Sequence, residues 1–336
     1  MTETTREKKR RSLLQQELEL EGLWTRLGAS DESLATVLLG ELLHALKIPR
    51  HERTLPAYGS IIWPEEEVGA DERLAPSSLD KARALVNGTS SFLRRDKDGT
   101  LTVECFERRR DSELEMVMLS DTCQGTVVQR TPAGVVKGYT GRDVVVYEQG
   151  VWYAKPYSSR FARIVTSATP SAELAVVRSV LRLAVHELSA ANIGATLILR
   201  IDRTPEEELQ GVHEGTNVAD LSLDVNRAVH VGPIAHLLAR ADGAMILSRS
   251  GHVQEFGCHL SYTDRARDSI EATGGTRHTS AKCYSYDEPR TLVVTVSEDG
   301  PVTVFSHGAK LVELAPRSAD SEDDQQTETA SDEIDD

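Results

Sequence analysis

The chain has 336 residues, of which 39% are hydrophobic and 27% are charged, and its formal net charge is −15. The length predicts two domains, and the composition is typical of a soluble globular protein. No apolar run reaches the ~18–20 residues that a membrane span needs, and no apolar segment follows the basic run at residues 6–11, so neither a membrane helix nor a secretory signal is expected.

Negative charge is concentrated near the end of the sequence. Residues 316–336 contain nine acidic residues, one arginine and almost no apolar side chain. Such a segment buries too little surface to offset its ordering entropy, so residues 315–336 are predicted to be a disordered acidic tail. The rest of the chain gives no strong nucleic-acid signal, because the composition does not suggest the basic face of a duplex-DNA binder.

Cysteine and histidine spacings do not fit the common metal and disulfide frameworks. The four cysteines lie far apart and form no CxxC pair, which favours reduced thiols in a cytoplasmic protein. His186-Glu187 is not followed by the second histidine of a zinc-protease helix. Surface or core positions are therefore expected for His186, His213, His230 and His236.

The first 90 residues favour helices joined by an irregular connection. Apolar residues at helical spacing predict a charged, partly amphipathic helix over residues 6–27 and a second helix after an N-cap at Ser30-Asp31. Residues 49–76 are rich in Pro, Glu and Gly and are predicted to be irregular. A short helix is expected at residues 79–87.

From about residue 90 to residue 168 the hydrophobic pattern has a period of two, which indicates strands. Three hairpins are expected, around turns at residues 98–99, 132–134 and 148–150. Trp152 and Tyr153 are expected to be core or sheet residues rather than a ligand cage. Residues 1–168 are therefore predicted to form N-terminal helices plus a smaller α+β, mainly antiparallel domain, which shows no catalytic motif.

Residues 169–314 alternate between helix and strand. A helical stripe starts after Ser171, the expected N-cap, and runs to Leu188. The elements that follow predict an α/β domain with a mixed sheet flanked by helices. Strands are expected at 193–199, 242–247, 252–258, 292–296 and 302–305, and helices at 233–240, 265–272 and 276–286.

Two segments of this second domain carry residues suited to nucleotide chemistry. Asp242-Gly243-Ala244 places a carboxylate at a strand start, beside residues small enough for a ligand to approach the backbone. Residues 274–281 read GGTRHTSA, in which glycines precede a helix start that carries Arg277 and hydroxyl side chains. Amide groups at a helix start favour phosphate, and arginine adds a bidentate partner. Either segment alone is a weak signal.

In their order and spacing, these segments resemble the diadenylate cyclase (DAC) domain first known from the DNA integrity scanning protein DisA. The resemblance rests on Asp242-Gly243-Ala244, then on the GTRH sequence at residues 275–278, then on a strand that ends in SEDG at residues 297–300. It covers about 140 of the 336 residues. Two positions depart from the family pattern: Thr279 stands where a basic residue is usual, and His259 stands where an aromatic residue is often found.

The resemblance implies an enzyme that joins two ATP molecules into cyclic di-AMP and releases two pyrophosphates, with Mg²⁺ or Mn²⁺. Asp242 is expected to bind the metal and activate the 3′-hydroxyl, with Glu298 or Asp299 as further metal candidates. Arg277 and His278 complete the catalytic set. Phosphate or nucleotide contacts are expected from Gly243, Ala244, Leu260, Gly275, Thr276, Arg277, His278, Ser280 and Ser297.

The same resemblance implies a homodimer or higher homo-oligomer with facing active sites, and a regulatory or sensor role for residues 1–168 with an unknown ligand. One alternative stays open because of Thr279: a catalytically weak module that binds ATP or cyclic di-AMP and regulates a partner. A second alternative is a scaffold that recruits partners through its charged ends, but it leaves the two motifs unexplained.

Overall fold

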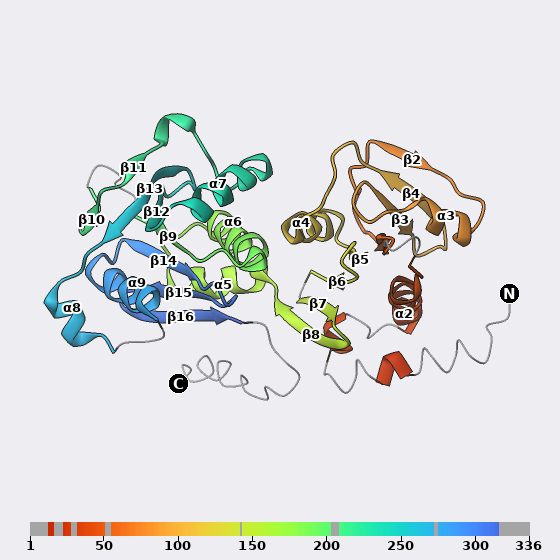
Figure 1. Cartoon of the computed structure of the whole chain (residues 1–336), viewed down its shortest axis with the longest axis horizontal. Helices are drawn as coiled ribbons and strands as arrows, with labels where there is room; N and C mark the ends of the chain where they lie inside the picture. Colours follow the sequence, from red (N-terminus) through yellow and green to blue (C-terminus); the bar gives the residue numbers. More distant parts are fainter. Residues whose placement is uncertain are drawn as a thin grey trace, which may run out of the picture.

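The computed structural model describes residues 13–16, 23–27, 32–50, 55–141, 143–202, 208–271 and 275–315 (Figure 1). The predicted acidic tail and much of the predicted helix over residues 6–27 lie outside these residues. Among the helices described, none is long and apolar enough to cross a membrane.

The N-terminal sheet has eight strands in the order β2-β4-β3-β1-β5-β6-β7-β8. Only the pairing of β1 with β3 is parallel, so the predicted mainly antiparallel character is confirmed. The three predicted hairpins correspond to β3–β4, β5–β6 and β7–β8. The strands are β1 (Tyr58–Ile62), β2 (Glu72–Leu74), β3 (Ser91–Arg95), β4 (Leu101–Cys105), β5 (Thr126–Arg130), β6 (Val136–Tyr139), β7 (Asp143–Glu148) and β8 (Val151–Pro156).

Helices cover both faces of this sheet. Alternate residues along a strand point to opposite faces, so Ile62 packs with α2 and Ile61 packs with α4. A capping box between Ser112 and Glu115 fixes the start of α4. The helical elements are η1 (Thr25–Leu27), α2 (Glu32–Lys47), α3 (Leu79–Leu85) and α4 (Glu113–Cys123).

The C-terminal sheet is mixed, as predicted, and contains the strand order β10-β13-β12-β9-β14-β15-β16, with β11 paired to β13. β12 and β9 are parallel and the other pairs are antiparallel. The strands are β9 (Ala195–Arg200), β10 (Val212–His213), β11 (Thr216–Asn217), β12 (Ala244–Leu247), β13 (Val253–Leu260), β14 (Thr291–Val296), β15 (Val302–Ser306) and β16 (Ala309–Leu314).

Helices also cover both faces of the C-terminal sheet. α5, α6 and α7 pack on one face, and α9 packs on the other through Ala281 and Tyr284. In Figure 1, β8 leads from the N-terminal sheet directly into α5. The helical elements are α5 (Ser158–Ala168), α6 (Leu174–Leu183), the π-helical turn η2 (Ala184–Leu188), η3 (Ser189–Ala191), η4 (Ala219–Leu221), α7 (Ala228–Arg240), α8 (Asp264–Ser269) and α9 (Thr276–Asp287).

The structure corrects the sequence-based assignment of several elements. The region predicted as period-two strands also contains α4 and α5, and the segment predicted as irregular contains the fully buried strand β1. Pro233 lies inside α7 rather than in the first turn of a shorter helix. Glu173, not Ser171, occupies the N-cap of α6, and its side chain makes no capping hydrogen bond.

Candidate functional site

A cavity of about 900 Å³ lies in the C-terminal domain, where four segments from different parts of the chain meet. These are the start of β12, the end of β13, the first turns of α9 and the turn between β14 and β15. A volume of this size lies in the range of small-molecule sites. The cavity is lined by Thr196, Asp242, Gly243, Ala244, Cys258, His259, Leu260, Tyr262, Gly275, Thr276, Arg277, His278, Ser280, Ser297, Asp299, Pro301, Thr303, Phe305, Lys310 and Glu313.

Asp242 presents an exposed carboxyl group at the start of β12, and its Oδ1 accepts a 2.9 Å hydrogen bond from the Gly243 amide. Gly243 has a φ of +101°, and a Cβ atom there would lie 2.8 Å from the carbonyl oxygen of Cys258. Only glycine fits this combination of left-handed backbone and close approach to β13. Gly243 therefore allows the Asp242 carboxyl group to lie at the cavity.

The start of α9 faces the cavity through Gly275, Thr276 and Arg277. Gly275 is the N-cap residue, no side chain caps the helix, and the first turn contains no acidic residue. The first amide groups of an α-helix have no partner within the helix, and they carry the positive end of its dipole. This end of α9 is therefore suited to an anionic group such as a phosphate.

The Arg277 guanidinium is held at the edge of the same cavity. Its Nη2 lies 3.8 Å from Glu298 Oε1, and its Nη1 donates a 3.5 Å hydrogen bond to the carbonyl oxygen of Val296. The side chains of Arg277 and Glu298 are 36% and 73% exposed, so this ion pair is weak and a polyanionic ligand would compete for the guanidinium.

His278 packs its ring edge-on against Phe305, with the ring centroids 6.2 Å apart. Burial lowers the pKa of His278 below its usual value, and Arg277 acts in the same direction while Glu313 opposes it. The imidazole is therefore neutral near pH 7. A neutral imidazole still donates one hydrogen bond and accepts another at the cavity wall.

Almost all of the site residues predicted from the sequence line this one cavity: Asp242, Gly243, Ala244, Leu260, Gly275, Thr276, Arg277, His278, Ser280, Ser297 and Asp299. Glu298 is not among the lining residues and contacts Arg277 instead. Thr279, at the position that departs from the family pattern, does not line the cavity either.

Sequence reasoning missed several lining residues. Lys310 and Glu313 come from β16, which was not predicted, although alternating exposed and apolar residues over 309–314 are a strand signal. Thr196 comes from β9, and Thr303 and Phe305 come from β15. They were missed because strands that are buried over their whole length do not reveal which residues border a cavity.

The carboxylates at the cavity fit a hard divalent cation. Asp242 and Asp299 both line it, and oxygen ligands of this kind suit Mg²⁺ and Mn²⁺. Within the described ranges no three His, Cys, Asp or Glu residues form a metal-binding group. Mg²⁺ is commonly held by one or two carboxylates together with substrate phosphates, and such a donor set matches these residues.

Comparison with known protein families assigns both parts of the chain. Residues 13–156 match the family described as probable sensor domain DACNK, and residues 182–310 match the DAC family, described as DisA bacterial checkpoint controller nucleotide-binding. The C-terminal α/β domain is thus similar to nucleotide-binding domains of this family, and the part of the chain before it is similar to a sensor domain. The match to the DAC family confirms the resemblance that the motifs predicted for this part of the chain.

Two solved structures are also similar to this chain. A hypothetical membrane spanning protein from Bacillus cereus is 19% identical, with a TM-score of 0.31, and the match covers 42% of this chain and 71% of that one. A double-cysteine variant of DacA from Staphylococcus aureus is 24% identical, with a TM-score of 0.26, and the match covers 43% of this chain and 87% of that one. No curated protein matches the chain.

Proposed function

We propose that this protein is a metal-dependent diadenylate cyclase that condenses two ATP molecules into cyclic di-AMP and two pyrophosphates in the cytoplasm. The observation that carries the proposal is the meeting, in one cavity, of the Asp242 carboxyl group with the uncapped start of α9 and Arg277. A carboxylate facing a phosphate-binding helix start is the arrangement that nucleotidyl transfer requires.

The reaction forms a bond between the 3′-oxygen of one ATP and the α-phosphorus of the other, and it breaks the bond from that phosphorus to pyrophosphate. Repeating the step with the roles exchanged closes the ring. Each pocket binds one ATP in this proposal, so two copies of the chain must face each other. Holding the two nucleotides in line is mainly a positioning task, which favours a rigid site.

The site residues take the following roles in this proposal. Asp242 accepts the 3′-hydroxyl proton, and Asp242 and Asp299 would hold Mg²⁺ or Mn²⁺. Arg277 and the α9 amides bind phosphate oxygens and stabilise the negative charge that grows on the leaving pyrophosphate. The bound metal ion would add Lewis-acid stabilisation of the same charge.

The direct test is to incubate the full chain with ATP and Mn²⁺ or Mg²⁺ over a range of protein concentrations and to measure cyclic di-AMP by mass spectrometry. We expect product, a specific activity that rises with protein concentration, and loss of activity in Asp242→Asn. Asp220→Asn is the matched control, because Asp220 is an exposed carboxylate of the same domain outside the cavity.

The test also separates the second candidate function, a module that binds ATP or cyclic di-AMP without turnover. Saturable ATP binding with no product under either metal would support the binding module. The usual basic residue is absent at Thr279, but Lys310 supplies a basic side chain to the same cavity from β16, and this favours the enzyme.

A further inference from the structure

Helix α4 belongs to the hydrophobic cores of both halves of the molecule. Met116 and Val117 pack in the core between α4 and the N-terminal sheet. Leu114 and Met118 pack instead with α5, α6 and the C-terminal sheet. Because its two apolar sides are fixed to different domains, a shift of α4 changes the contacts of both.

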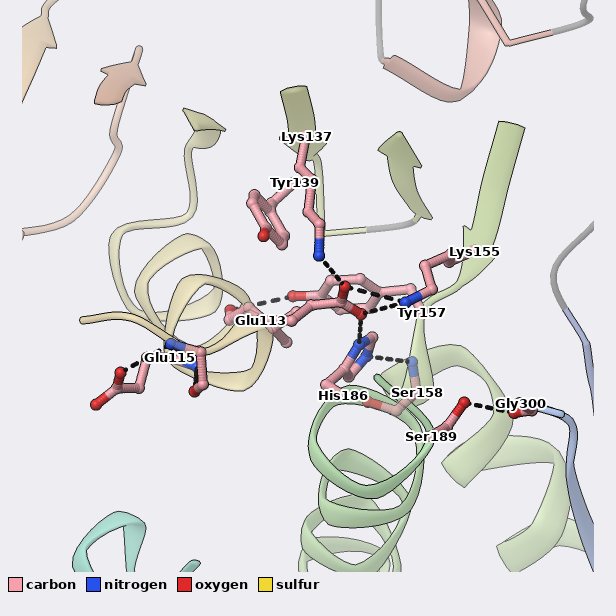
Figure 2. Close-up of polar contacts among 12 residues, drawn as sticks. Glu113, Glu115, Lys137, Tyr139, Lys155, Tyr157, Ser158, His186, Ser189 and Gly300 are labelled. Atoms are coloured by element: carbon pink, nitrogen blue, oxygen red, sulfur yellow. Dashed lines mark hydrogen bonds and ion pairs between the residues drawn. The ribbon is translucent and has the colours of Figure 1, made fainter. Parts of the chain in front are cut away.

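A buried carboxylate on α4 meets the C-terminal domain at this junction (Figure 2). The side chain of Glu113 is 1% exposed and accepts hydrogen bonds from Lys137 at 2.6 Å and from Lys155 at 3.1 Å. Burial alone would raise the pKa of Glu113, but the hydrogen bond from His186 and the charges of both lysines outweigh it and hold the pKa below its usual value. Glu113 is therefore ionised.

His186 receives this contact on the C-terminal side and is fully buried. Its Nδ1 lies 3.2 Å from Glu113 Oε1, and its Nε2 accepts a 3.4 Å hydrogen bond from the backbone amide of Ser158 (Figure 2). A backbone N–H can only donate, so the ring proton is on Nδ1 and is donated to Glu113. Burial lowers the pKa of His186, in agreement with a neutral ring.

His186 lies in the π-helical turn η2, and Ser189 follows this turn directly. Ser189 Oγ donates a hydrogen bond to the carbonyl oxygen of Gly300 (Figure 2). Gly300 closes the turn between β14 and β15, in which the Gly300 amide donates to the Ser297 carbonyl oxygen at 3.0 Å. Ser297, Glu298 and Asp299 lie on this turn beside the candidate active site. Ser189 therefore anchors the turn that positions these three residues.

We propose that Ser189 is a positioning residue for the active-site turn 297–300. In this proposal the Glu113–His186 contact lets the N-terminal domain regulate the active site through η2 and Ser189. This inference rests on the proposed cyclase function. A π-helical turn holds one residue more than an α-helical turn, so conversion of η2 to α-helix would rotate Ser189 by about 100° around the helix axis. Such a rotation would break the bond to Gly300 and release the turn, so η2 supplies two discrete arrangements for the N-terminal domain to select between.

The first experiment measures steady-state cyclic di-AMP synthesis by full-length variants. We expect Ser189→Ala to lower kcat by roughly tenfold with little change in the KM for ATP, because a displaced turn costs alignment rather than ground-state binding. Ser189→Thr, which keeps the hydroxyl, should restore most of the rate. Ser179→Ala is the matched control, because the Ser179 hydroxyl bonds only within α6. An unchanged kcat in Ser189→Ala would overturn the proposal.

The second experiment needs no turnover and uses hydrogen exchange of the peptide that spans residues 297–303. Exchange should be faster in Ser189→Ala and in Glu113→Gln, and unchanged in Ser179→Ala. Glu113→Gln leaves two lysines without their partner and can unfold the junction, so Asp121→Asn is measured beside it. Asp121 lies on α4, is 24% exposed in its side chain, and contacts Arg182 of α6 and the hydroxyl of Tyr157.

The two experiments keep the failure of this inference apart from failure of the cyclase proposal. Faster exchange in Ser189→Ala and Glu113→Gln, without any cyclic di-AMP from the wild type, would reject the cyclase function and keep the coupling. Product from the wild type, with wild-type exchange at residues 297–303 in all variants, would reject the coupling and keep the cyclase.

Discussion

Gly194 lies directly against the guanidinium of Arg277. A Cβ atom at position 194 would stand 2.4 Å from Arg277 Nη1 and 2.8 Å from Glu298 Cγ. Those groups are the ends of flexible side chains, so a larger residue at 194 would displace them rather than the backbone. Gly194, just before β9, therefore sets where the Arg277 guanidinium lies, which is proposed to bind phosphate.

Gly194→Ala should weaken ATP binding by roughly tenfold, about the loss of one charge-assisted hydrogen bond, while the melting temperature stays close to that of the wild type. Isothermal titration with a non-reactive ATP analogue measures this. Gly232→Ala is the matched control, because a Cβ there meets no atom within 4 Å. Equal affinity in Gly194→Ala and the wild type would show that Arg277 does not bind the nucleotide.

The two acidic residues after β14 should differ in function, since Asp299 lines the cavity and Glu298 contacts Arg277. We expect Asp299→Asn to raise the Mn²⁺ concentration needed for half-maximal activity by roughly tenfold, because it removes an ionic oxygen ligand. Glu298→Gln should leave the metal requirement unchanged and alter mainly the KM for ATP. Metal titrations of both variants at saturating ATP provide the measurement, and an effect of Glu298→Gln on the metal requirement would contradict the assignment.

Lys310 should bind the polyphosphate of ATP from β16, which contributes none of the sequence motifs. It lines the cavity and pairs with Glu313 on the same strand. Lys310→Met is expected to raise the KM for ATP by roughly three- to tenfold, whereas Glu313→Gln should lower it, since the lysine is then no longer held by a carboxylate. Lys282→Met serves as the control, because Lys282 bonds the carbonyl oxygen of Glu271 and does not line the cavity. The idea fails if both cavity variants shift KM in the same direction.

The fold class was predictable from the sequence because its signals are local, and most of the candidate site was predictable because the order and spacing of its motifs resemble those of the diadenylate cyclase domain. Gly243 marks a position where the backbone has a positive φ and approaches β13 closely, and such needs restrict the residue type. The hairpins between β3 and β8 were predictable for a similar reason, since turn residues punctuate alternating strands.

The elements that were missed depend on long-range packing. α4 packs into two cores and therefore has buried residues all around it, so its sequence lacks the one-sided stripe of a surface helix. The Glu113–His186 contact joins residues 73 positions apart, and no spacing rule connects them. β1 was missed because a strand buried on both faces does not alternate, and the neighbouring prolines and glycines made the segment look irregular.

The stability of the N-terminal domain should fall in mild acid because of His44, which packs edge-on against Tyr58 with centroids 4.8 Å apart. Burial, reinforced by Arg83, lowers the pKa of His44 to about 4. Between pH 6.5 and 4 the unfolded state therefore binds a proton that the folded state does not, and the free energy of unfolding decreases as the pH falls.

All three tryptophans lie in the N-terminal part, so tryptophan fluorescence during thermal unfolding reports on this domain. The midpoint should drop less between pH 7 and pH 5 in His44→Gln than in the wild type, whereas the exposed-site control His236→Gln should follow the wild type. Parallel pH profiles for wild type and His44→Gln would mean that His44 keeps its ordinary pKa in the folded protein.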